Sequence, residues 1–107
     1  ADVDARNDVG ASALMWAAAT GELQVVRCLA QECGADVNAK TKDGNTALVV
    51  AGQNDRIDIV RCLVEQCGAD LSVQNNEGMS ALNLAAQRGK LELVRYLVEY
   101  SGEDTNV

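Results

Sequence analysis

The chain repeats itself every 34 residues, and this period constrains the fold more than any other feature. Glycines recur at this spacing in two series, Gly10, Gly44 and Gly78, and Gly34, Gly68 and Gly102. A fixed period of this length is typical of a stack of similar supersecondary units, each packing only against its neighbours. The 107 residues hold three periods, so we expect one elongated domain rather than a closed globule.

Composition excludes several classes of function. The net charge of −7 argues against a nucleic-acid partner, because such proteins present a basic face. The sequence has no apolar run of about 18 residues, so membrane insertion is not expected. A charged-then-apolar leader is not seen either, so no signal peptide is visible. With no histidine and no glycine-rich phosphate loop before a lysine, the chain is not expected to be an enzyme or to hold a cofactor.

The four cysteines form two pairs with five-residue spacing, Cys28 with Cys33 and Cys62 with Cys67. Five residues of an α-helix turn through a net angle of about 140°, so the two thiols of a pair should point apart. Adjacent helices pack about 8–10 Å apart, whereas a disulfide needs Cα atoms within about 7 Å. We therefore expect free thiols with a packing role, in a reducing, intracellular and cytoplasmic setting. The spacing also differs from the close pattern of zinc sites, so no metal is expected.

Each period contains the signals of two helices followed by an extended finger. In the middle unit Gly44 marks a turn, and Thr46 is placed to cap a first helix over residues 47–53. Apolar residues at helical spacing predict a second helix over residues 57–66, which Gly68 would end. Ser12 and Ser80 are the equivalent capping residues of the outer units.

This unit resembles the ankyrin repeat. That family combines a glycine turn, Thr-Pro-Leu-His, two alanines, a Val-x-x-Leu helix and a closing Gly-Ala-Asp. The middle unit matches it at Gly44, Thr46, Leu48, Ala51, Val60, Leu63, Gly68, Ala69 and Asp70. The tetratricopeptide pattern, which has a similar period, does not recur. The resemblance implies an all-α repeat solenoid, a stack of antiparallel helix pairs joined by extended β-turn fingers.

In this scheme residues 1–107 form a single domain. Residues 1–6 are the tail of a preceding repeat, and the repeats span residues 7–40, 41–74 and 75–107. Such an opening suggests an excised or engineered block of a longer array; the alternative is a complete short protein with an ordered leader. The third unit carries Tyr96 and Tyr100 and could serve as a polar C-terminal cap.

Three departures from the family pattern carry expectations. Alanine replaces the family's proline in every unit, so the first helices start without a fixed φ. The period exceeds the family's usual length by one residue, near Cys33 and Cys67, which predicts a second helix longer by about one residue. Gly52 replaces a helical alanine, a change that costs up to about 1 kcal/mol.

In ankyrin arrays, partners bind the concave face formed by the finger tips and the exposed side of the first helices. Carried over to this sequence, that face predicts a protein partner at Asp8, Val9, Ala11, Thr20, Lys42, Asp43, Asn45, Gln53, Asn54, Asn76, Glu77, Met79, Gln87 and Arg88. These positions vary between units while the framework stays fixed. Val9 and Met79 are expected to be exposed and to contribute most. The alternative is a structural or engineered scaffold with no dedicated partner.

Trp16 aligns with Val50 and Leu84 and is expected in the core. A second interpretation leaves its edge uncovered, where it would drive end-to-end self-association.

Overall fold

The structure is a computed structural model that describes residues 3–101, apart from the side chain of Ser101. Its helices pair in chain order as α1 (Ala13–Thr20) with α2 (Leu23–Arg27), α3 (Ala47–Gln53) with α4 (Ile57–Gln66), and α5 (Ala81–Gln87) with α6 (Leu91–Ser101). A π-helical turn, η1 (Cys28–Glu32), continues α2. No strand occurs within residues 3–101, and the predicted all-α solenoid is confirmed. The exact division into repeats stays a prediction.

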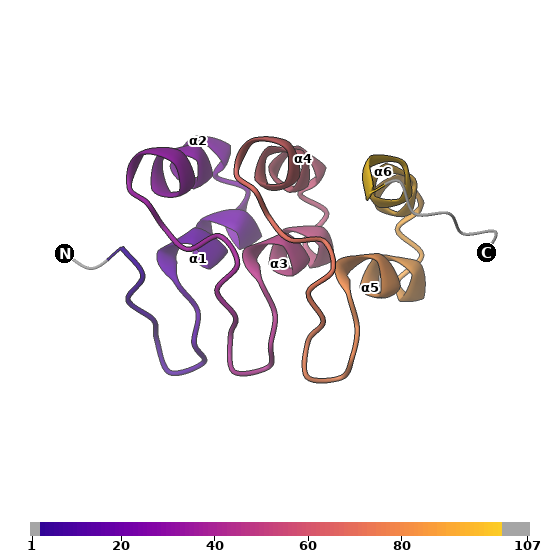
Figure 1. Cartoon of the computed structure of the whole chain (residues 1–107), viewed down its shortest axis with the longest axis horizontal. Helices are drawn as coiled ribbons and strands as arrows, with labels where there is room; N and C mark the ends of the chain where they lie inside the picture. The colour runs from indigo at the N-terminus through magenta and orange to yellow at the C-terminus, as the bar shows by residue number, and fades with distance from the viewer. Residues whose placement is uncertain (1–2, 102–107) are drawn as a thin grey trace.

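The helices form two rows (Figure 1). Helices α1, α3 and α5 make an inner row, from which three fingers extend side by side, and α2, α4 and α6 make an outer row. The molecule measures 46 × 26 × 20 Å, so it is longest along the direction of stacking. Each unit therefore buries its apolar side chains against the next unit, as in other linear repeat arrays.

Hydroxyl side chains begin all three inner helices, as predicted. Ser12 Oγ accepts a hydrogen bond from the backbone of Met15, and Thr46 Oγ1 accepts one from the backbone of Val49. In α5, Ser80 Oγ accepts a hydrogen bond from the Asn83 backbone, and Asn83 Oδ1 accepts one from the Ser80 backbone, which completes a capping box. These caps satisfy N–H groups that have no partner inside the helix, so each helix begins at a defined residue without the family's proline.

The core is built mainly from alanine, valine and leucine, and its small side chains let neighbouring helices approach closely. Leu14, Ala18, Leu48 and Ala51 are buried along the inner row. Gly52 is also buried, and a Cβ atom added there would lie 2.9 Å from Leu93 Cδ2. The helical glycine therefore makes room for a side chain of the following unit, which gives a packing reason for its low helix propensity.

The ends of the second helices differ from two expectations, and the first of these differences is seen in the first unit only. In the first unit the extra residue is taken up by η1, in which the Cys33 N–H donates to the Cys28 carbonyl at 3.0 Å, five residues back. A π turn holds one more residue than an α turn, so the α-helix itself is not extended. The prediction that the paired thiols point apart is wrong. The sulfur atoms of Cys28 and Cys33 lie 3.8 Å apart, and those of Cys62 and Cys67 lie 3.9 Å apart.

The expected packing role holds for only part of the cysteine set. Cys62 is buried and Cys67 is partly buried, but Cys28 and Cys33 are exposed.

Candidate functional site

Each finger is a tight turn that one side chain at its base holds in shape. Asn7 Oδ1 accepts hydrogen bonds from the backbone N–H groups of Val9 at 3.0 Å and Ala11 at 2.9 Å. Thr41 and Asn75, at the equivalent positions of the next two fingers, also accept hydrogen bonds from the turn backbone. Short polar side chains form such local bonds readily, so the sequence fixes the shape of each tip on its own.

Neighbouring fingers are bonded to one another. The Lys42 N–H donates to the Val9 carbonyl at 3.1 Å, and the Asn76 N–H donates to the Asp43 carbonyl at 3.0 Å. At Gly44 the backbone has φ +83°, and an added Cβ atom would lie 2.9 Å from the Asn76 nitrogen. Glycine is therefore required both for its conformation and for the close approach of the next finger. Through these hydrogen bonds the three fingers form one continuous surface, which we call the finger wall.

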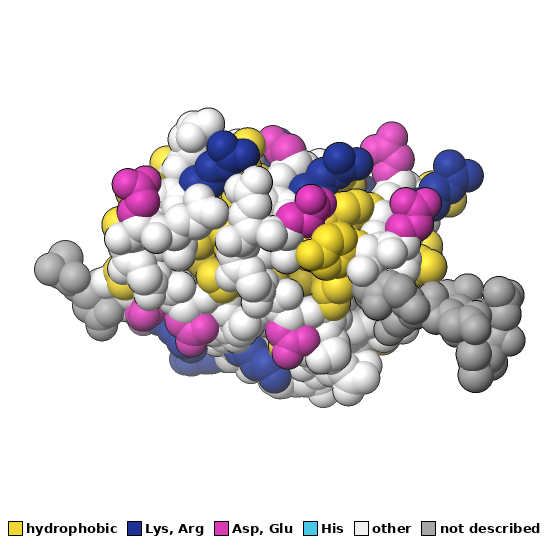
Figure 2. All heavy atoms as spheres, turned by 45° about the horizontal axis from the view of Figure 1, so that its top comes forward, with side chains coloured by type: hydrophobic (Ala, Val, Ile, Leu, Met, Phe, Trp, Pro, Cys, Tyr) yellow, Lys and Arg dark blue, Asp and Glu magenta, His cyan; other side chains and the backbone are white. Residues whose placement is uncertain are grey.

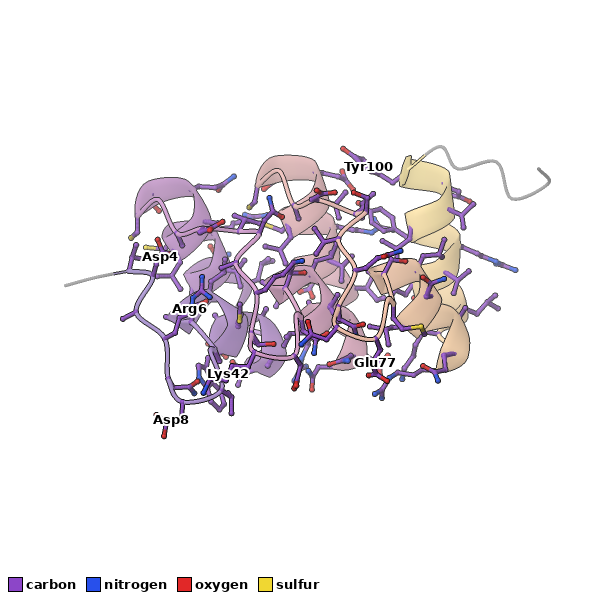
Figure 3. The ribbon with its side chains drawn as sticks, turned by 60° about the horizontal axis from the view of Figure 1, so that its bottom comes forward. Asp4, Arg6, Asp8, Lys42, Glu77 and Tyr100 are labelled. Carbon is purple, nitrogen blue, oxygen red and sulfur yellow. The ribbon has the colours of Figure 1, made fainter. Side chains whose placement is uncertain are left out.

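The predicted partner-binding residues lie along the finger wall and on the inner helices α1, α3 and α5. Figure 3 shows Asp8, Lys42 and Glu77 at the tips of successive fingers. Exposed members of the predicted set are Asp8, Val9, Thr20, Lys42, Asp43, Asn54, Asn76, Glu77, Gln87 and Arg88. Partly buried members are Ala11, Asn45, Gln53 and Met79. Met79 was expected to be an exposed apolar residue, and this is incorrect.

The first two units enclose an apolar hollow of about 210 Å³ between fingers and inner helices. It is lined by Val9, Ala11, Met15, Trp16, Ala19, Thr41 and Val50. Trp16 is 57% exposed, so its predicted place in the core is wrong. Ala13, Trp16 and Thr20 follow the i, i+3, i+7 spacing of one helix face, and all three are exposed, so this face of α1 points to solvent.

The second and third units enclose a polar hollow of about 430 Å³. It is lined by Asp43, Asn45, Gln53, Asn75, Asn76, Glu77, Leu84, Gln87 and Arg88. Seven of these nine residues belong to the predicted set, so the structure brings half of that set around one depression.

Family models account for nearly the whole chain. The model described as "Ankyrin repeats (3 copies)" matches residues 1–75, and the model described as "Ankyrin repeat" matches residues 77–107. This chain belongs to the ankyrin repeat family. No curated protein sequence matches it significantly. Ankyrin repeats generally mediate protein–protein interaction without enzymatic activity. Among the described residues, no helix is both long and apolar enough to cross a membrane.

The two hollows of this ankyrin array occupy equivalent places, 34 residues apart. Val9, Ala11 and Ala19 in the apolar hollow correspond to Asp43, Asn45 and Gln53 in the polar one. The backbone arrangement is thus repeated while the lining changes from apolar to polar.

Five predicted residues line neither hollow. Asp8 and Lys42 lie at finger tips, and Met79 is partly buried. Thr20 and Asn54 return to their own helices: Thr20 Oγ1 donates to the Trp16 carbonyl at 2.9 Å, and Asn54 Nδ2 donates to the Val50 carbonyl at 2.8 Å. The side chains of Thr20 and Asn54 therefore satisfy backbone carbonyls at the ends of the inner helices.

The outer helices of the ankyrin array carry interspersed acidic and basic side chains (Figure 2). Tyr96, expected on a polar cap, instead reaches back to α4, where its hydroxyl donates to Glu65 Oε2 at 2.5 Å and Arg61 lies over its ring at 5.2 Å. Burial, followed by the bond to Glu65, raises the pKa of Tyr96 well above its usual range. This contact joins the second unit to the third.

Proposed function

We propose that this ankyrin array is an intracellular, non-enzymatic module that binds a partner protein across its concave face. An apolar side chain of the partner would occupy the first hollow, and polar groups of the partner would contact the second. The observation that carries the proposal is the exposure of Val9 (59%) and Trp16 (57%) beside a hollow with an apolar lining. Clustered exposed apolar residues with a polar surround are typical of protein-binding sites.

Trp16 is suited to be the main anchor. Its ring offers a large contact area with little conformational entropy to lose, and tryptophan is enriched among residues that dominate binding energy. The ring lies beside Val9 and Val50 rather than alone, so a partner side chain would contact several apolar groups at once. Covering these groups would remove apolar surface from water, which is favourable.

The second hollow would determine which partner fits. It presents both acidic side chains, Asp43 and Glu77, and the basic side chain of Arg88, together with amides. Polar groups of this kind favour a partner that can pair with them and penalise one that leaves them unpaired. A binding segment should therefore be apolar at one end and polar at the other.

Selection from a displayed peptide library against the folded chain tests the proposal. We expect selected peptides to share an apolar residue, and their binding should change the fluorescence of Trp16, the single tryptophan. Replacing Trp16 with leucine, the residue at the equivalent position 84, should weaken binding about 30-fold, the effect of losing roughly 2 kcal/mol at an anchor.

Two control variants separate binding from folding. Trp16→Leu should leave the free energy of unfolding within about 1 kcal/mol of the original, because the ring is mostly exposed. Tyr100→Ala changes an exposed aromatic residue at the far end of the array and should leave peptide affinity unchanged. Peptides that bind Trp16→Leu as tightly as the original would refute the proposed surface. An absence of selected binders would favour the scaffold alternative.

A further inference from the structure

Two pairs of thiols lie at the ends of successive outer helices, away from the proposed binding face. The Cys28 and Cys33 sulfurs are 3.8 Å apart, and the Cys62 and Cys67 sulfurs are 3.9 Å apart. The pairs are related by the 34-residue period, so they occupy the same place in two units. The third unit has Tyr96 and Ser101 at these positions and therefore has no such pair.

The backbone brings the sulfurs together at the end of each helix. In the first unit η1 closes a five-residue hydrogen bond between Cys33 and Cys28. Both units then end in the same way, since the N–H groups of Ala35 and Ala69 each reach a carbonyl six residues back, Leu29 and Leu63, at 2.9 Å. The second cysteine of each pair thus lies at the residue that ends its helix, where the backbone departs from ideal α geometry and the two thiols can meet.

The number of thiols and the distance between them limit which metal or metalloid a pair can bind. Within the described residues, no group of three or more Cys, His, Asp or Glu side chains is placed to hold a metal ion. A structural zinc ion needs four protein ligands, and a thiol pair would supply only two of them. A linear ion with bonds of about 2.3 Å to sulfur would need sulfurs about 4.6 Å apart. At 3.8 Å the same bonds meet at about 110°, an angle that three- and four-coordinate centres share. A trivalent, pyramidal centre that brings its own third substituent needs only the two thiols.

The two pairs differ in accessibility. Cys28 and Cys33 are both exposed, whereas Cys62 is buried and Cys67 is partly buried. The hydrogen bond to Cys33 is the main cause that raises the pKa of Cys28, and burial is the main cause that raises the pKa of Cys67 to about 11. With these raised pKa values, Cys28 and Cys67 hold their protons at neutral pH, which disfavours chemistry that starts from their thiolates.

We infer that Cys28 and Cys33 form a chelating dithiol site for trivalent arsenicals, and that Cys62 and Cys67 form a second, slower site of the same kind. The reaction is a condensation. An organic arsine oxide, R–As=O, reacts with the two thiols. Two arsenic–sulfur bonds form in place of the arsenic–oxygen double bond, and the oxygen leaves as water with the two thiol protons. Arsenic stays trivalent and both sulfurs keep their oxidation state, so no oxidant is needed.

Phenylarsine oxide added to the reduced full chain is the probe. Intact mass spectrometry should show each bound arsenical removing two reactive thiols, with peptide mapping placing the first on Cys28 and Cys33. Because the second bond forms within the molecule, a pair should bind about 10²- to 10⁴-fold more tightly than one thiol. The adduct should therefore survive excess glutathione and be released by 2,3-dimercaptopropanol.

Two variants with equal numbers of thiols give the control. Cys62→Ser with Cys67→Ser keeps the exposed pair, while Cys28→Ser with Cys67→Ser keeps two thiols in different units. The first should retain one arsenical in glutathione and the second none. Equal retention by both would overturn the inference, because thiol number rather than pairing would then set binding. Should serine at the buried position 62 prevent folding, mapping on the original chain decides: a first arsenical bound outside Cys28 and Cys33 would equally overturn it.

Discussion

The two junctions of the array use the same backbone and different side chains. In the first junction, where α1 and α2 meet α3 and α4, the fingers are joined by Lys42 and Val9, and the hollow beside them is apolar. In the second, where α3 and α4 meet α5 and α6, Asn76 and Asp43 make the same bond beside a polar hollow. Stacking is therefore set by the framework, and the linings are free to differ.

The turns between the helices show the same contrast. Arg56 in the first junction donates from Nε to the Ala19 carbonyl at 3.2 Å, at the end of α1. Its equivalent in the second junction, Lys90, instead forms a salt bridge of 3.0 Å with Asp55, which replaces the glycine found at positions 21 and 89. Asp55 adopts φ +59°, a conformation that favours glycine, so the second junction combines a surface ion pair with a strained turn.

The largest expected effect is at the finger glycines. Gly44→Ala should lower the free energy of unfolding by about 2–4 kcal/mol, because alanine must adopt positive φ and its Cβ would crowd the Asn76 backbone. Gly78 has φ +76° but no described atom within 4 Å of an added Cβ, so Gly78→Ala should cost only about 1–2 kcal/mol. Urea unfolding of both variants measures the difference. Equal losses would show that the second junction does not need the close approach of its fingers.

The next largest effect on the free energy of unfolding is expected for Arg56 compared with Lys90. Arg56→Met should destabilise the chain by about 1–2 kcal/mol, since it removes a partly buried, charge-assisted hydrogen bond to the end of α1. Lys90→Met should cost no more than about 0.5 kcal/mol, because Asp55 is 62% exposed and surface ion pairs contribute little. Thermal and urea unfolding would compare them, and a larger loss for Lys90→Met would reverse the ranking of the two turns.

A smaller effect is expected at Tyr96. Tyr96→Phe should cost about 1 kcal/mol at pH 7 through the lost bond to Glu65. The raised pKa keeps Tyr96 protonated in the folded chain, while the unfolded chain titrates near pH 10. This contribution is present below about pH 10 and is lost as pH rises beyond it, so the difference between the two proteins should narrow between pH 9 and 11.

Urea unfolding across that pH range, with Tyr100→Phe as the exposed control, measures the change. A difference that stays constant with pH would mean that Tyr96 does not link the second unit to the third through its hydroxyl.

Most of the fold could be predicted because its signals are local. Helices α3 and α4 run over the residues that the sequence indicated, and Ser12, Thr46 and Ser80 cap the inner helices as expected. A capping hydroxyl acts within one turn, so it can be recognised without knowledge of the neighbours.

The missed features depend on geometry that an ideal helix does not contain. The thiol pairs lie where the helices end, in the first unit at a π turn, and a rotation of 100° per residue along an ideal α-helix could not reveal this. Trp16 was placed by alignment with Val50 and Leu84, but only its own helix face shows that it is exposed. Tyr96 faces α4 through contacts between units, which composition alone does not specify.

The most direct test of the account exchanges the lining of one hollow for that of the other. The triple variant Val9→Asp, Ala11→Asn, Ala19→Gln gives the first hollow the residues of the second. We measure the free energy of unfolding and the affinity for peptides selected on the original chain. The account predicts stability within about 1 kcal/mol of the original and at least about 30-fold weaker binding. Unchanged affinity, or a variant that no longer folds, would contradict the claim that these positions are equivalent in backbone and distinct in function.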